Sequence, residues 1–203
     1  MRAERQRSSV GVDRQCSTMG VDRQRSTARR TRFAGLLVLV ALVMAARAEA
    51  SEPTPVSVDV LFLYTPGVTT RYGSAVDTRL QHLINVSNQI FAASEAGVRL
   101  RHVYSQEVAY GDASSSGEAL DAVTQNQGVF SNVEALRASH GADLVVLLRP
   151  YANDGTCGMA WIGGYRANGD FSYSRRYGYS HVCPDCSDTT LAHELGHNMG
   201  LMH

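Results

Sequence analysis

Apolar and polar positions alternate along the middle of the chain in short blocks that are typical of β-strands. Three runs rich in β-branched and apolar residues predict buried strands over 56–64, 98–108 and 142–148. Thr65-Pro66-Gly67 follows the first run and predicts a turn there. Pro150 ends the third run, since proline has no backbone N–H to donate to a strand ladder.

Between these strands, the apolar residues follow a helical spacing. This spacing predicts a long amphipathic helix over 77–94 and a helix over 118–138 that a break at Gly128 would divide. The order strand, helix, strand, helix, strand predicts an α/β sheet with crossover helices. A polar loop is expected over 111–117.

The stretch 151–187 is the least regular part of the chain. It contains one short predicted strand, over 156–162, followed by Gly163-Gly164. It also carries an aromatic and basic segment, which could stack on nucleic acid but is better interpreted as loop packing with some contact to substrate. The residues of this segment are Tyr165, Arg166, Phe171, Tyr173, Arg175, Arg176, Tyr177 and Tyr179.

The N-terminal region reads as a leader. Residues 1–32 hold nine Arg against three acidic residues, a net charge of +6. They contain too few apolar residues to form a core, so this segment is predicted to be disordered. A gene start placed too far upstream would explain its presence. Residues 33–50 combine a short apolar run with Ala-x-Ala sites and predict a secretory signal peptide, with an uncleaved anchor as the alternative. A secreted protein without stable membrane association is therefore expected.

The remaining part, 51–203, is long enough for one domain with its own core. It holds nine Arg against fifteen Asp and Glu, a net charge of −6, which argues against nucleic acid as a partner. The sequence does not determine an oligomeric state.

The end of the chain carries the clearest chemistry. Residues 193–203 read H-E-L-G-H-N-M-G-L-M-H. On a helix, His193 and His197 lie one turn apart on one face, so both imidazoles can bind one metal ion. Glu194 would flank the ion and hold a water, and Gly200 would end the helix so that His203 returns as third ligand.

The pattern H-E-x-x-H-x-x-G-x-x-H resembles the zinc signature of the metzincin metalloendopeptidases. Thr189 to Ala192 and Cys157 to Trp161 resemble the reprolysin-type branch, in particular the bacterial peptidyl-Asp metalloendopeptidases. The resemblance covers roughly residues 55 to 203. It implies a metzincin-like α+β fold: a mixed twisted sheet of about five strands, two long helices, the metal-binding helix and an edge strand that lines the cleft.

The same resemblance implies a secreted endopeptidase with one catalytic Zn²⁺ and with Glu194 as general base. An extended peptide substrate would pair with the edge strand at Gly158, Met159, Ala160 and Trp161, although these residues could instead pack under the sheet. Two rivals are a gluzincin, with a downstream Glu as third ligand, and a non-catalytic zinc-binding fragment. The family pattern continues with an Asp and a Met-turn, so we expect 51–203 to be the N-terminal, upper part of a catalytic domain.

Three cysteines follow the predicted signal peptide. A disulfide is expected from Cys157 to either Cys183 or Cys186, and the odd thiol would then need a partner beyond residue 203. His181 is interpreted as a core or loop histidine. Calcium ligands could come from Asp154, Asp170, Asp185 and Asp188, but no spacing supports a calcium site.

Overall fold

The computed structural model describes residues 54–164 and 172–203. The predicted leader (1–32) and signal peptide (33–50) lie outside the described residues, as do Tyr165, Arg166, Asp170 and Phe171. The described residues belong to one structural unit, 52–203. No helix among them is long and apolar enough to cross a membrane.

A five-stranded mixed sheet forms the centre of this unit, in the order β2-β1-β3-β5-β4. The neighbours from β2 to β5 run parallel, and β4 pairs antiparallel with β5. Strand β4 is therefore an edge strand, as the resemblance implied. The strands are β1 (Val56–Tyr64), β2 (Val98–Glu107), β3 (Leu144–Leu148), β4 (Gly158–Ala160) and β5 (Tyr179–Val182).

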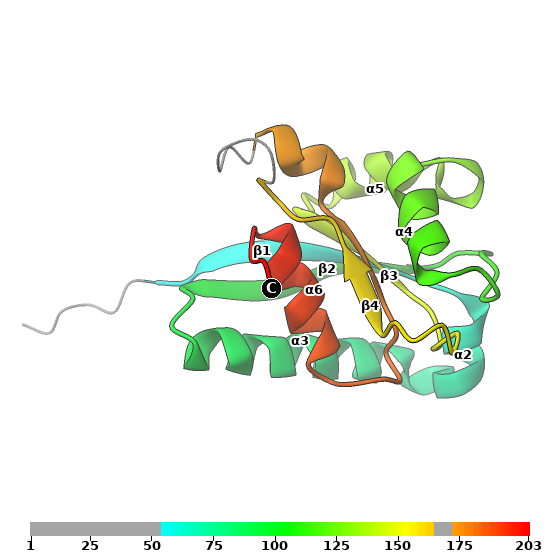
Figure 1. Cartoon of the computed structure of the whole chain (residues 1–203), viewed down its shortest axis with the longest axis horizontal. Helices are drawn as coiled ribbons and strands as arrows, with labels where there is room; N and C mark the ends of the chain where they lie inside the picture. The colour runs from blue at the N-terminus through cyan, green and yellow to red at the C-terminus, as the bar shows by residue number, and fades with distance from the viewer. Residues whose placement is uncertain (1–53, 165–171) are drawn as a thin grey trace, which may run out of the picture. The chain divides into compact units, whose positions relative to one another are not determined.

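Helices cover both faces of the sheet (Figure 1). One apolar core lies between the sheet and α3 with α6, and the other lies between the sheet and α4 with α5. The helices are α2 (Pro66–Tyr72), α3 (Val76–Ala93), α4 (Ser116–Gln125), α5 (Val133–Ser139) and α6 (Thr190–Asn198), with 3-10 turns η1 (Gly73–Ala75), η2 (Gly128–Phe130) and η3 (Tyr173–Tyr177).

One local prediction was wrong, and one strand was not predicted. The turn expected at Thr65 to Gly67 is the start of α2, where Pro66 takes the first helical position and its missing N–H has no consequence. Strand β5 was missed because its sequence, Y-S-H-V, does not look like a buried strand, yet all four residues are buried.

The second predicted helix is divided where its pattern allowed a break. Helix α4 begins with a capping box in which Ser115 and Glu118 bond each other's backbone N–H groups, and it ends at Asn126 with φ 53°. Gly128 has φ 58° and opens the turn η2 that leads to α5. These left-handed residues redirect the chain, so one amphipathic pattern is folded into two helices on the same face of the sheet.

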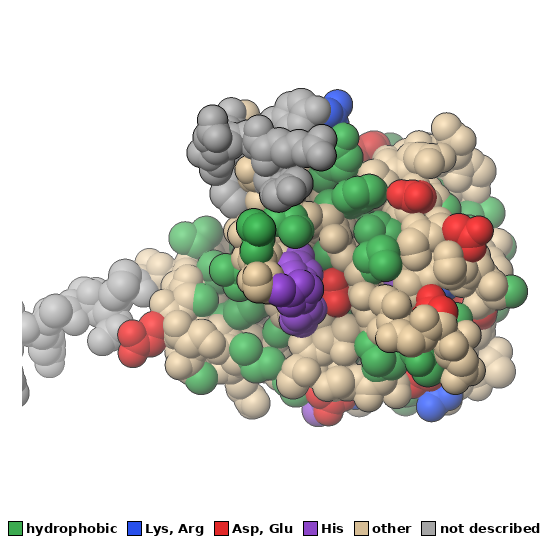
Figure 2. All heavy atoms as spheres, in the orientation of Figure 1, with side chains coloured by type: hydrophobic (Ala, Val, Ile, Leu, Met, Phe, Trp, Pro, Cys, Tyr) green, Lys and Arg blue, Asp and Glu red, His purple; other side chains and the backbone are tan. Residues whose placement is uncertain are grey.

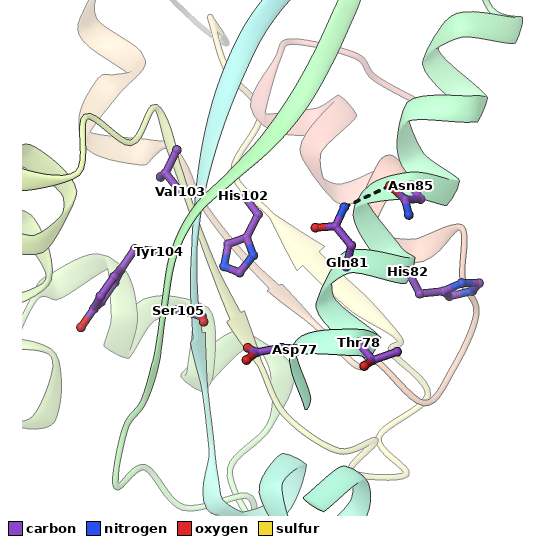
Figure 3. A pocket seen from close by; sticks show the side chains of 9 residues that line it. All are labelled: Asp77, Thr78, Gln81, His82, Asn85, His102, Val103, Tyr104 and Ser105. Carbon is purple, nitrogen blue, oxygen red and sulfur yellow. Dashed lines mark hydrogen bonds between the residues drawn. The ribbon is translucent and has the colours of Figure 1, made fainter. Parts of the chain in front are cut away.

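Strand β2 forms the other edge of the described sheet. Asn88 of α3 caps its outer side, because its amide accepts from Leu100 N (2.7 Å) and donates to Leu100 O (3.0 Å). Val103 is an extra residue in the pairing with β1, which is a β-bulge. A groove of about 810 Å³ runs between this part of β2 and α3 and contains His102 and Asp77 (Figure 3).

Candidate active site

Helix α6 carries the metal-binding motif and ends in a Schellman motif. Leu201 N bonds Gly196 O at 3.0 Å, and Gly200 N bonds His197 O at 2.9 Å. Gly200 has φ 99°, which favours glycine, and so reverses the chain as predicted. This reversal brings His203 back over the face of α6 that bears His193 and His197.

The three histidines converge on one point. Their ligand nitrogens lie within 4.8 Å of one another, and theirs is the one cluster with metal-ligand geometry that the described residues contain. His193 Nε2 lies 3.1 Å from both His197 Nε2 and His203 Nε2. Tetrahedral coordination at the usual Zn–N distance places ligand nitrogens roughly 3.3 Å apart, so this spacing fits a zinc ion. Figure 2 shows the histidines together at the surface, beside an acidic side chain.

The tautomer of His197 is determined by the turn that follows the helix. Its Nδ1 lies 2.8 Å from Leu201 O, so Nδ1 carries the hydrogen and donates to this carbonyl. The lone pair is then on Nε2, the atom that faces the other two histidines. Metal-binding histidines in proteins are commonly oriented in this way.

Glu194 lies beside the histidine cluster but is 5% exposed. Burial raises the pKa of Glu194 to about 7, and nearby His197 opposes this shift. The pKa of His193 is lowered by burial and by its histidine neighbours, which favours the neutral, metal-binding form of the ring. The site therefore combines neutral nitrogen donors with a carboxyl group that can accept or release a proton near neutral pH.

Strand β4 presents its free edge next to Glu194. Cys157 O accepts from Cys183 N, just after β5, at 2.8 Å, and Trp161 N donates to Tyr179 O of β5 at 3.4 Å. Met159 lies opposite His181. In an antiparallel ladder alternate residues point the other way, so the N–H and C=O groups of Gly158 and Ala160 face the open side. The side chains of Met159 and Trp161 pack against the α4 core, which leaves the backbone free to bind a ligand.

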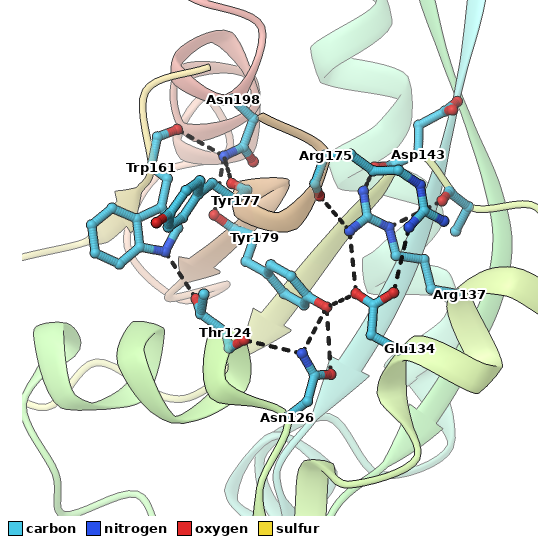
Figure 4. Close-up of polar contacts among 11 residues, drawn as sticks. Thr124, Asn126, Glu134, Arg137, Asp143, Trp161, Arg175, Tyr177, Tyr179 and Asn198 are labelled. Carbon is cyan, nitrogen blue, oxygen red and sulfur yellow. Dashed lines mark hydrogen bonds and ion pairs between the residues drawn. The ribbon is translucent and has the colours of Figure 1, made fainter. Parts of the chain in front are cut away.

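Two contacts that sequence reasoning missed tie α6 to the sheet. Gly163 N donates to His197 O at 2.8 Å. The Asn198 side chain lies among the carbonyl groups at the ends of β4 and β5 (Figure 4). Asn198 stands at a position that the pattern H-E-x-x-H-x-x-G-x-x-H leaves unspecified, so the pattern gave no signal of this contact.

A disulfide joins Cys157 to Cys186, with their Cα atoms 5.8 Å apart. It connects the start of β4 to the loop before α6. The alternative pairing of Cys157 with Cys183 is wrong. Cys183 is a free thiol with no exposed surface, and burial raises its pKa to about 12. Because it is enclosed within the core, the expectation that this thiol needs a partner beyond residue 203 is not supported by its packing.

The described aspartates that were considered for calcium have protein partners. Asp154 accepts from Ser116 N and Thr156 N, and Asp185 accepts from Tyr151 N and pairs with Arg71. Asp188 pairs with Arg79 and His82. These carboxylates fix loops to helices.

These features define a metzincin-like zinc metallopeptidase domain. They are the twisted mixed sheet with its antiparallel edge strand, the three converging histidines, two of which lie on α6, and the buried glutamate of the same helix. Residues 54–203 match the metallo-peptidase family M12B, reprolysin-like, and the chain belongs to this family. Membership implies zinc, and the nitrogen donor set described above is compatible with it.

Curated relatives agree with this assignment. The chain is 36% identical over 168 residues to a peptidyl-Asp metalloendopeptidase of Pseudomonas aeruginosa, a match that covers 77% of this chain and 27% of that protein. It is 27% identical over 159 residues to a peptidyl-Asp metalloendopeptidase of Stenotrophomonas maltophilia, covering 77% and 36% of the two chains. The chain thus spans about a third or less of the length of these relatives.

A solved structure shares the fold. One chain in a structure described as "Structure of a chaperone-substrate complex" superposes with a TM-score of 0.60 and 27% identity. The match covers 74% of this chain and 25% of that chain. It supports the mixed sheet and helix arrangement of the described unit.

Proposed function

We propose that this chain is the N-terminal, upper part of the catalytic domain of a secreted zinc-dependent endopeptidase. The observation that carries the proposal is the position of Glu194, which is buried against the edge strand and adjoins three imidazoles that converge within 4.8 Å. His193, His197 and His203 would hold one zinc ion, and Glu194 would act on protons.

The substrate would bind as an extended peptide along β4. The outward N–H and C=O groups of Gly158 and Ala160 would pair with its backbone, which gives affinity with little dependence on side chains. Met159 and Trp161 would support the strand from behind through their packing on α4. A peptide bound there passes next to Glu194, because Gly158 and Glu194 are in contact.

When bound, zinc would supply a Lewis acid for the scissile carbonyl and lower the pKa of a coordinated water to about 7. Glu194 would accept the proton that this water loses and then donate it to the leaving amine. Burial suits the carboxyl group to both steps, because it brings the pKa of Glu194 to about 7. Throughout these steps, the Nδ1–H group of His197 would keep its hydrogen bond to Leu201 O.

Secretion is supported by two observations. The pattern over 33–50 is typical of a cleaved signal peptide, and the Cys157–Cys186 disulfide is of a kind that persists in oxidising compartments. A preference for peptide bonds at aspartate is proposed only from the name of the relatives, peptidyl-Asp metalloendopeptidase. Mass spectrometry of a digested peptide pool tests this preference.

The test is Glu194→Gln in the full-length protein, with Glu107→Gln as control. Glu107 is exposed at the end of β2, the opposite edge of the sheet. We expect Glu194→Gln to bind as much zinc as the wild type and to hydrolyse no peptide, while Glu107→Gln keeps full activity. Hydrolysis by Glu194→Gln would contradict the role of Glu194. A wild-type protein that binds zinc but cleaves no peptide would instead support the non-catalytic alternative.

A further inference from the structure

Strand β4 is only three residues long, and both of its ends are attached to segments that adjoin α6. The Cys157–Cys186 disulfide holds its start to the loop that leads into the helix. Its far end meets Asn198, the last residue of the helix. Between these two attachments, Gly158 contacts Glu194. The position of the open edge relative to the metal-binding helix therefore depends on these attachments, together with the backbone bond from Gly163 N to His197 O.

The contact of Asn198 closes the end of the β4–β5 ladder. Its amide nitrogen lies 2.9 Å from Trp161 O and 3.0 Å from Tyr179 O, with Tyr177 O farther away at 3.5 Å (Figure 4). An amide group surrounded by carbonyl oxygens must direct its two N–H groups at them. Asn198 is 5% exposed, so water does not replace these bonds readily.

Trp161 is fixed from a second direction as well. Its indole Nε1 donates to Thr124 Oγ1 of α4 at 2.9 Å, and its ring packs edge-on against Tyr177. The indole contacts fix Trp161 relative to α4. Among the described residues, Asn198 is the side chain of α6 that hydrogen-bonds the backbone at the end of β4.

We propose that Asn198 is a positioning residue that sets the distance and register between the substrate-binding edge strand and the metal-binding helix. This inference rests on the proposed function of the site. The hydrogen bonds of the Asn198 side chain go to backbone carbonyl groups and not to the nitrogens of the three histidines. It acts through Trp161 and Tyr179, and thereby places the outward groups of Gly158 and Ala160 relative to Glu194.

The test compares Asn198→Ala with Asn88→Ala in the full-length protein. Asn88 is a matched control, because it also bonds the backbone of an edge strand with its amide, but at Leu100 on the opposite edge of the sheet. Both variants are expected to unfold at lower temperature with unchanged zinc content. For a long peptide substrate, kcat/KM of Asn198→Ala should fall by about 10- to 100-fold, mainly through KM. For a short peptide that does not reach along β4, it should change little.

Asn88→Ala should keep the wild-type KM for both peptides. A merely structural role of Asn198 would lower thermal stability without separating the long peptide from the short one, and that result would overturn the proposal. If Asn198→Ala does not fold, Asn198→Ser retains one donor and should show a smaller loss of the same kind.

Hydrogen exchange provides a readout that does not need activity. The Trp161 amide, which bonds Tyr179 O, should exchange faster in Asn198→Ala, while the Leu100 amide should exchange faster in Asn88→Ala. Unchanged exchange at Trp161 would also overturn the proposal. If the wild-type protein is inactive, the proposed function is refuted, but the exchange measurement still tests the Asn198 contact. If the wild type is active and Asn198→Ala has the same kcat/KM for the long peptide, only the inference about Asn198 is refuted.

Discussion

Gly158 and Glu194 are so close that no side chain fits between them. A Cβ atom on Gly158 would lie 2.6 Å from both Cγ and Oε1 of Glu194, well inside van der Waals contact. Glycine at this position therefore allows the edge strand to lie directly on the carboxyl group. The same contact buries Glu194 and so contributes to its raised pKa.

Gly158→Ala should displace the Glu194 carboxyl group or β4, because the added methyl group cannot be accommodated. A displacement of about 1 Å near a reacting centre can reduce the rate on the order of 100-fold, and we expect a loss of kcat/KM of this size with zinc retained. Gly117→Ala in α4 is the control, since its nearest atom would be Met159 Sδ at 3.9 Å. Wild-type kinetics in Gly158→Ala would contradict the close approach.

His203→Ala should weaken zinc binding without unfolding the protein. His203 is exposed, and its ring contacts are with the rings of His193 and His197. Loss of a partner that only orients a ligand costs about 10- to 100-fold in metal affinity, so loss of a ligand should cost at least as much. Competition with a chelating dye measures the zinc affinity, and circular dichroism measures whether the fold is retained. His140→Ala is the control, because His140 is also an exposed histidine. Unaltered affinity would favour a different third ligand, as in a gluzincin.

Acid should destabilise the fold through His181. This histidine has no exposed surface, and burial together with the neighbouring Arg149 guanidinium lowers its pKa to about 3. The unfolded chain binds a proton near pH 6.5, so this part of the stability is present above pH 6.5 and is lost as the pH falls toward 3. At pH 5 the loss should be about 2 kcal/mol.

Urea unfolding of the wild type and of His181→Gln at pH 7 and pH 5 measures this contribution. Glutamine can still accept the hydrogen bond from Arg149 but does not titrate. The variant should therefore lose less stability than the wild type between these pH values. Equal losses would show that His181 takes up its proton over the same pH range in the folded and the unfolded protein, which would contradict the lowered pKa.

Replacing Cys157 and Cys186 together with serine should lower the free energy of unfolding by about 3–4 kcal/mol, the value expected for a loop of this length. The separation of the two residues is 29 positions. Oxidised wild type and the double variant can be compared by urea unfolding. Cys183→Ser is the control for thiol chemistry, because the buried Cys183 forms no disulfide. An unchanged free energy of unfolding in the double variant would mean that packing, without the disulfide, holds β4 in place.

The sequence was most informative where one physical effect dominated. Strands β1 and β2 and helix α3 have regular apolar periods, so burial of those side chains predicted them nearly to the residue. The convergence of the three histidines could be predicted because helical geometry and a single glycine reversal determine their spacing. These are local relationships, and they do not need knowledge of the rest of the fold.

Features that depend on tertiary contacts could not be predicted in this way. Strand β5 buries Ser180 and His181, which only its central place in the sheet explains. The choice between Cys183 and Cys186 depended on which side chain points into the core. The contacts of Asn198 join residues 19 and 37 positions away, so no pattern around the motif could reveal them.

The capped outer side of β2 has a consequence for self-association. An uncovered strand is a template on which identical chains can stack into aggregates, and a peptidase of this design must keep one edge uncovered. In the described sheet, Asn88 occupies the backbone groups of Leu100 and the bulge at Val103 interrupts the regular ladder. With Leu100 capped and the ladder interrupted at Val103, β2 is a poorer template for a further strand than β4, so we expect strand addition between molecules to occur at β4.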